Sequence, residues 1–206
     1  MPAPLAQEQR RLARDRIERA ALAVLGREGM ASTVEDVAAE AGVSARTVFR
    51  HYGTRDHMIA TALRAQLQHY GDTLPRPEKG AKLDDWLPKL LVEVHRRNAA
   101  LGRAYWELAA HGDHLDGELA EVAELRRAAR TRLVTAVATT AWRLSGRRGR
   151  PPAWLVDVFA IHLSSFATRS LVADFGRDPD DAAEASARAL LALLEAPASQ
   201  PGRTTR

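Results

Sequence analysis

The feature that most constrains this chain is a succession of segments with apolar residues at helical spacing, separated by short breaks. In the first segment, expected as a helix over about 7–28, the apolar face consists of Leu12, Ile17, Ala20, Ala21, Val24 and Leu25. Gly29 stands where the C-cap of this helix is expected. Alanine, leucine, arginine and glutamate dominate, and runs of β-branched residues are scarce, which favours helix. We therefore predict an all-α fold.

Two short helices follow, expected over about 34–40 and 45–51, with the residues of a tight turn between them. Thr33 begins a capping-box arrangement at the start of the first of the two. Gly42 can take the positive φ that the turn needs, and Ser44 can cap the second helix. This is the pattern of a helix-turn-helix that reads DNA.

The rest of the chain divides at turn signals. A fourth helix runs to about residue 70, and residues 71–82, with two prolines and two glycines, are a linker. Five further helices are expected, about nine in all, at 84–99, 102–111, 116–145, 153–175 and 179–195, with a loop over 146–152. We predict a helix-turn-helix DNA-binding domain over 1–56 (the motif at about 33–52), a second helical domain over 57–196, and a disordered tail over 197–206.

Charge sets the second short helix apart. From Val43 to Arg55 the sequence has no acidic residue, while Arg46, Arg50 and Arg55 are cationic. A helix that enters a groove of DNA requires this, because a carboxylate there would face the phosphates. The net charge of the chain, +4, would not by itself indicate DNA.

The stretch from Thr33 to Asp56, TVEDVAAEAGVSARTVFRHYGTRD, resembles the signature of the TetR/AcrR family of transcriptional regulators almost position for position. The resemblance implies an N-terminal three-helix DNA-binding domain and a C-terminal helical domain for ligand binding and dimerisation. Two residues depart from the family's pattern. Phe49 replaces the usual tyrosine and removes one phosphate hydrogen bond, and Arg55 replaces the usual lysine and keeps the charge.

Carried over by position, the resemblance implies a set of DNA contacts. Ala45 and Arg46 would face base edges, with Arg46 able to read N7 and O6 of guanine. Ser44 and Thr47 would touch the backbone or bases. The other implied contacts, chiefly to phosphates, are Thr33, Phe49, Arg50, His51, Thr54 and Arg55.

Two alternatives stay open at the N-terminal end. The basic residues of the first helix are either a second phosphate-contacting set or a solvated face, because acidic residues are interspersed: Arg10, Arg11, Arg14, Arg16 and Arg19. Tyr52 either stacks on bases or belongs to the core, where it would pin the third helix to the first.

The last two expected helices, 153–175 and 179–195, combine leucine and phenylalanine with many alanines. Small residues permit close approach, so these helices either pack within one subunit or pair with a second copy in a four-helix bundle. A homodimer would place two reading helices roughly 34–36 Å apart, or a multiple of it, on a palindromic operator.

Aromatic and histidine side chains gather after residue 85, where the resemblance places an effector pocket. A pocket lined by rings with few polar atoms suits an apolar or aromatic ligand, although each ring alone could belong to the core. The residues predicted to bind it are Trp86, His95, Tyr105, Trp106, Trp142, His162 and Phe166.

No pattern of catalytic residues is visible, so we expect no enzyme and no cofactor. The chain has no cysteine, and the histidines at 111 and 114 do not have the spacing of a zinc site. No apolar stretch approaches the roughly 18 residues that span a bilayer, and no signal segment is visible. We expect a cytoplasmic repressor that a small molecule releases from double-stranded DNA; a helical enzyme and an adaptor that binds no DNA are the rivals.

Overall fold

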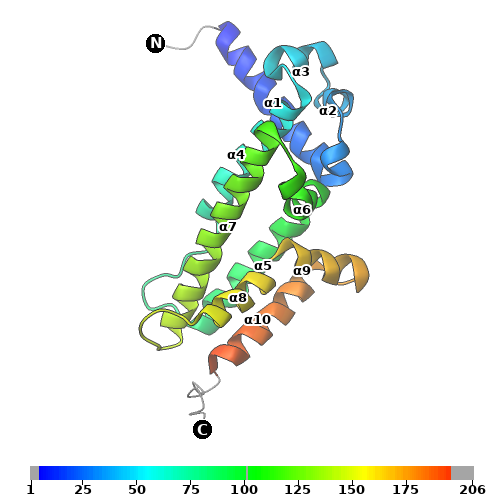
Figure 1. The fold of residues 1–206 in the computed structure, drawn as a ribbon. Coiled ribbons are helices and arrows are strands. Elements are labelled where there is room, and N and C mark those ends of the chain that lie inside the picture. The colour runs from blue at the N-terminus through cyan, green and yellow to red at the C-terminus, as the bar shows by residue number, and fades with distance from the viewer. Residues whose placement is uncertain (1–4, 101, 196–206) are drawn as a thin grey trace. The chain divides into compact units, whose positions relative to one another are not determined.

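The computed structural model describes residues 5–100 and 102–195, which form helices and turns without a strand (Figure 1). The all-α expectation is confirmed. The chain divides into two compact units. The first unit comprises Met1–Thr73 and Ala100–Arg130, and the second comprises Leu74–Ala99 and Thr131–Arg206. The predicted tail at 197–206 lies outside the described residues.

The first unit contains more than the three helices expected for the DNA-binding domain. It holds the helices α1 (Leu5–Glu28), α2 (Val34–Ala41), α3 (Ala45–Tyr52), α4 (Arg55–Asp72) and α6 (Gly102–His111), together with the start of α7 (Gly117–Leu144). Two short 3-10 turns, η1 (Gly29–Ala31) and η2 (Gly112–His114), join these helices. The boundaries of the predicted helices in this unit are confirmed to within about two residues.

One hydrophobic core holds the first unit together. Every one of its helices contributes a fully buried residue to this core: Ile17, Val37, Val48, Ile59, Leu108 and Val122. Because α6 and the start of α7 share the core with α1 to α4, they belong to the same packed body as the helix-turn-helix. Leu12 was predicted on the buried face of α1 but is 58% exposed, since it precedes the part of α1 that the core covers.

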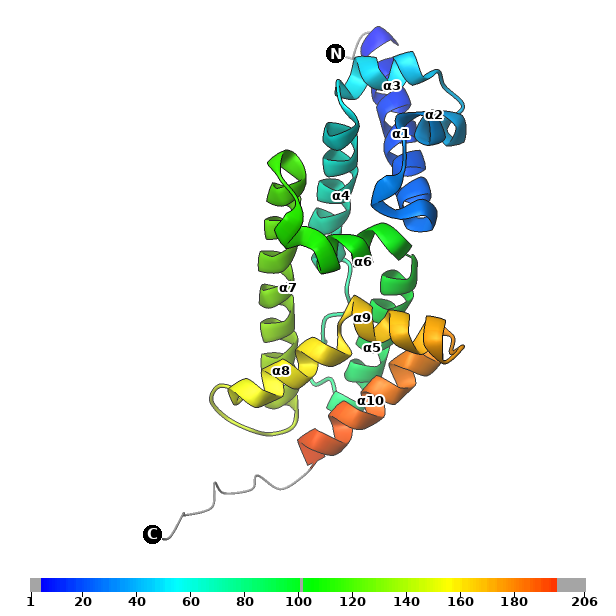
Figure 2. The ribbon, with the colours of Figure 1, turned by 45° about the vertical axis from the view of Figure 1, so that its right-hand side comes forward.

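The second unit consists of α5 (Leu83–Ala100), the rest of α7, α8 (Ala153–His162), α9 (Ser165–Arg169), a π-helical turn η3 (Ser170–Asp174) and α10 (Pro179–Glu195). Figure 2 shows α8 and α10 lying alongside each other. Their fully buried side chains include Leu155, Phe159 and Leu190. Among the described helices, none alone has the length and apolar character of a membrane span. The bent pair Ala153–His162 and Ser165–Asp174 together has the length and composition of one.

The single helix predicted over 153–175 is wrong, because the chain breaks after His162. Ser164 adopts an extended backbone, and its side chain accepts a hydrogen bond from the amide of Ala167 at 3.0 Å, which caps a new helix. The last residues of this segment then wind as the π turn η3. The sequence offers no glycine or proline at the break, so only the capping serine could have marked it.

Candidate nucleic-acid interface

The start of α2 is fixed by the predicted capping box. The amide of Asp36 donates to the Thr33 hydroxyl oxygen at 3.1 Å, and the amide of Thr33 donates to the Asp36 carboxylate at 2.9 Å. The Thr33 hydroxyl donates to the same carboxylate, and these hydrogen bonds lower the pKa of Asp36. Thr33 itself is exposed at the surface.

The turn between α2 and α3 is held by a residue of α1. Gly42 has φ 61°, as predicted, and ends α2 in the left-handed conformation. The guanidinium of Arg16 donates to the carbonyl of Ala41 at 2.8 and 2.6 Å, and to that of Gly42 at 2.9 Å. The positive charge of Arg16 also interacts favourably with the negative, C-terminal end of the dipole of α2. The sequence pattern alone left Arg16 among the residues of a mixed-charge face.

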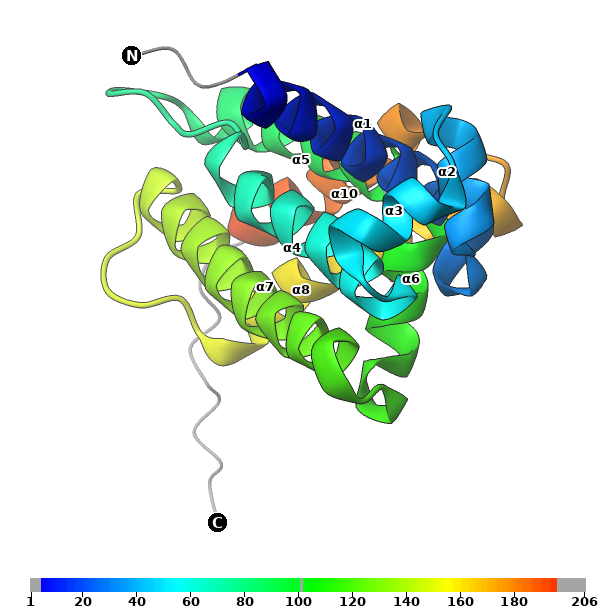
Figure 3. The same ribbon diagram turned by 90° about the horizontal axis from the view of Figure 1, so that it is seen from above.

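The helix α3 presents one face to solvent, and Figure 3 views the first unit from the side on which it lies. Ser44 caps α3, since its hydroxyl oxygen accepts from the amide of Thr47 at 3.2 Å. Val48 and Tyr52 face the core. The Tyr52 hydroxyl lies 3.3 Å from the Glu18 carboxylate of α1, so Tyr52 pins α3 to α1 and does not stack on bases.

Six of the residues implied as DNA contacts lie on the outer face of α3. Arg46, Phe49 and Arg50 are exposed, and Ala45, Thr47 and His51 are half-buried around them. Neither Arg46 nor Arg50 makes a hydrogen bond or ion pair with a residue of the described ranges. Both charges are therefore available to an outside partner.

Further cations extend this positive surface onto α1. Burial lowers the pKa of His51, and the charges of Arg50, Arg14 and Arg10 lower it further. Arg10 and Arg14 therefore act on the same region of space as α3. Arg14 is also paired with Glu18 at 2.9 Å, which belongs to the mixed-charge pattern seen in the sequence.

The two predicted contacts at the start of α4 are already engaged within the chain. Thr54 caps α4 by accepting from the amide of His57 at 3.1 Å. The guanidinium of Arg55 donates to the carbonyl of Ser32 at 2.7 Å, to that of Met30, and to Asp56 at 2.9 Å. Arg55 thus ties the start of α4 to the turn that precedes α2.

Polar contacts connect α4 with α7 inside the first unit. The imidazole Nδ1 of His57 lies 2.8 Å from Glu118, and this hydrogen bond lowers the pKa of Glu118. Arg64 pairs with Glu118 at 3.3 Å and with Glu121 at 2.6 Å. Two positions on α4, two helical turns apart, are therefore bound to the start of α7.

A second connection joins α6 to the segment before α2. The Glu107 carboxylate accepts from the amide of Met30 at 2.6 Å and from Arg103 at 2.5 Å. A β-carbon at Gly29, which has φ 80°, would meet this carboxylate at 2.4 Å. The positive φ at this position favours glycine, and the nearby carboxylate leaves little room for a side chain.

The residues predicted to line an effector pocket are divided between the two units. Tyr105 and Trp106 belong to α6 in the first unit. Tyr105 is buried and stacks on Tyr70, with ring centroids 6.5 Å apart. Trp106 is half-buried and lies edge-on to His111, with centroids 6.3 Å apart.

Two of the five predicted residues in the second unit meet in a polar network. His95 Nε2 lies 3.1 Å from the Ser186 hydroxyl, and His162 Nδ1 lies 3.3 Å from the same oxygen. The other nitrogen of His95 lies 2.9 Å from the Thr168 hydroxyl. Burial lowers the pKa of His95 to about 4, so His95 is neutral at pH 7. Phe166, also predicted, is 45% exposed.

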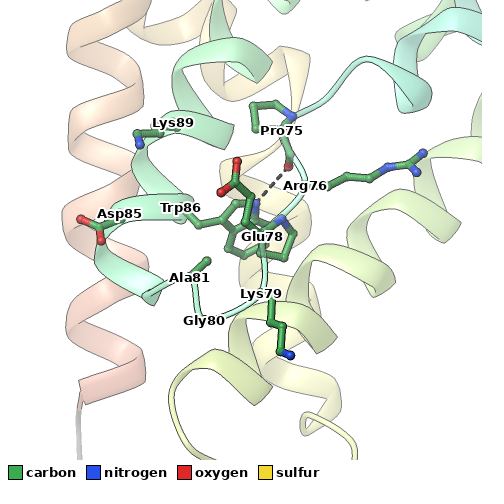
Figure 4. A pocket seen from close by; sticks show the side chains of 10 residues that line it. Pro75, Arg76, Glu78, Lys79, Gly80, Ala81, Asp85, Trp86 and Lys89 are labelled. Carbon is green, nitrogen blue, oxygen red and sulfur yellow. Dashed lines mark hydrogen bonds between the residues drawn. The ribbon is translucent and has the colours of Figure 1, made fainter.

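The two predicted tryptophans of this unit hold loops. The indole Nε1 of Trp86 donates to the carbonyl of Pro75 at 2.9 Å, and the linker encloses a shallow pocket beside it (Figure 4). The indole Nε1 of Trp142 donates to the carbonyl of Arg148 at 3.2 Å, and the Arg147 guanidinium lies 4.9 Å from the centre of its ring. Both indole rings therefore stabilise loops within the chain, without any ligand.

Comparison with known proteins finds a family match for part of the chain. Residues 17–62 match the family described as bacterial regulatory proteins, tetR family. A transcriptional regulator from Rhodococcus sp. Rha1 has a similar structure, with a TM-score of 0.67 and 21% identity over 87% of this chain and 96% of that one. A tetR-family regulator from Streptomyces coelicolor has a TM-score of 0.67 and 16% identity over 94% of this chain and 83% of that one. No curated protein sequence matches the chain.

Proposed function

We propose that this chain, whose N-terminal module and fold are those of TetR-family transcriptional regulators, is a repressor that a small molecule releases from its operator. One observation carries the DNA-binding part of this proposal. Arg46 and Arg50 are exposed and unpaired on a capped helix without a carboxylate. Other exposed arginines of the described chain either pair with acids, as Arg27 and Arg188 do, or lack a partner, as Arg132 and Arg143 do on α7. What sets α3 apart is that its unpaired cations lie on a helix with no acidic residue. Cations left without acids are available for the phosphates and base edges of a duplex.

The two ends of α3 have different tasks in this proposal. Ser44, Ala45, Arg46 and Thr47 occupy its first turn, which is the part of a recognition helix that meets base edges. The side chain of Arg46 is long enough to form two hydrogen bonds with a guanine. Phe49, Arg50 and His51, which lie further along the helix, would face the sugar-phosphate backbone.

Three other residues are proposed to contact phosphates, each by giving up a hydrogen bond or ion pair that it makes within the chain. The hydroxyl of Thr33, the cap of α4 at Thr54 and the guanidinium of Arg55 are engaged inside the chain. A phosphate near Arg55 would replace Asp56 as its anionic partner, while the backbone carbonyls continue to orient it. The amides at the start of α4 also favour an anion.

We infer that two copies bind a palindromic operator through a dimer built on α8 and α10. Most of the apolar residues of these helices are buried within the chain, but Trp154 and Ile161 on α8 and Leu193 on α10 are exposed. Trp154 and Ile161 are seven residues apart and so share a face of α8. Large exposed apolar side chains on neighbouring helices favour a protein partner over water.

Release by a ligand requires a path to the reading helices, and the first unit provides one. Glu107 of α6 binds the segment before α2, while Glu118 and Glu121 of α7 bind α4. A ligand that binds more tightly to a shifted arrangement of α6 and α7 would move α4 and α3 with them. The chain would act in the cytoplasm as a DNA-binding regulator and not as an enzyme.

The proposal is tested by selecting bound sequences from random double-stranded DNA with the purified chain. We expect a palindromic site whose half-sites lie one helical turn, or a multiple of it, apart. Recovery of unrelated sequences without half-site symmetry would contradict specific recognition by a dimer. Recovery of a single asymmetric half-site would contradict the dimer alone.

A further inference from the structure

An arginine in the first unit is buried without an acidic partner. Arg126 lies in α7, is 7% exposed, and its Nε is buried without a hydrogen-bond partner among the described residues. Its guanidinium lies 5.0 Å from the centre of the Tyr105 ring. The other charged groups that act on it are Arg127 and Arg130, which are both cations. The described chain therefore supplies no anion for this charge.

The next residue shows the ordinary arrangement. Arg127 lies nearer to the surface and pairs with Asp113 at 2.8 Å and with Glu124 at 2.5 Å. A surface ion pair of this kind contributes little to stability, whereas an uncompensated buried charge is strongly unfavourable. Among the described residues, the more exposed Arg127 thus has two acidic partners, and the buried Arg126 has none.

The surroundings of Arg126 are suited to an organic anion. Tyr105 of α6 lies beside Arg126, and burial raises the pKa of its hydroxyl, so the hydroxyl keeps a proton to donate. Arg130 lies one turn further along α7, and Tyr70 of α4 stacks on Tyr105. Three helices of the first unit meet here, and a planar guanidinium binds a carboxylate through two parallel hydrogen bonds.

We propose that Arg126 is the anion-binding group of the effector site, and that the effector is a small organic carboxylate held by Arg126 and the Tyr105 hydroxyl. The ligand class rests on the proposed ligand control of DNA binding. It narrows the predicted apolar or aromatic ligand to one that carries an acid group. The site is connected with the helix-turn-helix. Glu107 of α6 binds the amide of Met30 before α2, and Glu118 of α7 binds His57 of α4.

The test compares carboxylates with their neutral amides. The thermal midpoint of the dialysed chain is measured with benzoate, indole-3-acetate and hexanoate, each against its amide, and with phosphate at equal ionic strength. Binding to the folded state raises the midpoint, and the increase grows with the logarithm of ligand concentration over the dissociation constant. We expect at least one carboxylate to raise the midpoint by several degrees more than its amide or phosphate. The increase should disappear in Arg126→Met and remain in the matched control Arg127→Met.

Several results would overturn the inference. These are equal responses to carboxylates and amides, equal responses of wild type and Arg126→Met, or a response to phosphate alone. The ligand-free variant gives a second readout: Arg126→Met should be at least as stable as wild type, because it removes an uncompensated charge and keeps most of the volume. A large loss of stability would show that Arg126 serves the fold instead. DNA binding by the same samples separates the two proposals, since a chain that binds DNA but not carboxylates refutes only this one.

Discussion

The backbone of Gly102, at the start of α6, lies directly against the backbone of Gly26 in α1. A β-carbon at Gly102 would stand 2.2 Å from the Gly26 carbonyl oxygen, and Gly102 has φ 58°. This close approach lets α6 share the core of the helix-turn-helix. It makes α6 part of the packed body that carries α3.

Replacing Gly102 with alanine should therefore destabilise the chain strongly. Gly117→Ala is the matched control, because Gly117 has φ 52° but no atom within 4 Å of the added carbon. The positive φ should cost about 1–2 kcal/mol in both variants. The clash should add about 1–3 kcal/mol in Gly102→Ala alone. Urea unfolding measures both, and equal losses would show that α6 does not pack on α1 in this way.

Arg16 should support the turn of the helix-turn-helix from α1. In Arg16→Gln the carbonyls of Ala41 and Gly42 lose a charged donor, which should lower the free energy of unfolding by about 1 kcal/mol. The loss of affinity should be similar for all DNA sequences, because the turn positions α3 as a whole. Arg19→Gln is the control, since Arg19 bonds only to a carbonyl of its own helix at 3.3 Å. A change of sequence preference in Arg16→Gln would instead indicate a base contact.

Acid should destabilise the second unit through His95. Burial lowers the pKa of His95 to about 4, while an unfolded histidine has a pKa near 6.5. Between pH 6.5 and pH 4 the imidazole of His95 binds a proton in the unfolded chain but not in the folded chain. The contribution of neutral His95 to the free energy of unfolding is therefore complete above pH 6.5 and is lost as the pH falls toward 4. The loss from this residue should be about 3 kcal/mol.

The control for this pH effect is a histidine at the surface. His114 is exposed, so His114→Gln should keep the dependence of unfolding free energy on pH seen in the wild type, whereas His95→Gln should flatten it. The comparison concerns the change with pH and not the stability at pH 7, because His95→Gln also disturbs Ser186 and Thr168. Parallel curves for wild type and His95→Gln would contradict a neutral buried His95.

What the sequence could predict was set by local interactions. The helix-turn-helix is bounded by residues that act within a few positions of themselves: Thr33 and Ser44 as caps, and Gly42 as the left-handed turn. The same local logic would have found Ser164, whose capping role breaks the predicted helix over 153–175.

Other features depend on residues that are distant in the sequence. Arg16 lies 25 residues before the carbonyl of Ala41 that it binds, and the same mixed-charge helix face holds the paired Arg14. Whether Arg126 or Arg127 is buried depends on how α7 meets α6, which no local pattern fixes. The local signature over 33–56 thus predicts α2, α3 and the turn between them, whereas the distant residues that support them are found only in the folded chain.

The dimer proposed on α8 and α10 predicts the effect of a single charge. Ile161 is 62% exposed on α8, and Ile161→Glu should separate the dimer because a carboxylate would be buried in an apolar interface. Leu12→Glu is the control, since Leu12 is 58% exposed but lies in the first unit. Light scattering after size exclusion measures the mass of each. A monomeric wild type, or a dimer that persists in Ile161→Glu, would contradict this interface.

The most direct test of the account is the affinity of the chain for duplex DNA, measured against salt concentration for wild type, Arg46→Ala and the control Arg188→Ala. Arg188 is exposed and pairs with Glu184 in the second unit, so its loss should change nothing. We predict salt-sensitive binding by the wild type, and in Arg46→Ala a loss of about 1–3 kcal/mol of discrimination at one base pair. A wild type that binds no duplex at low salt, or an Arg46→Ala variant with full discrimination, would contradict recognition by α3.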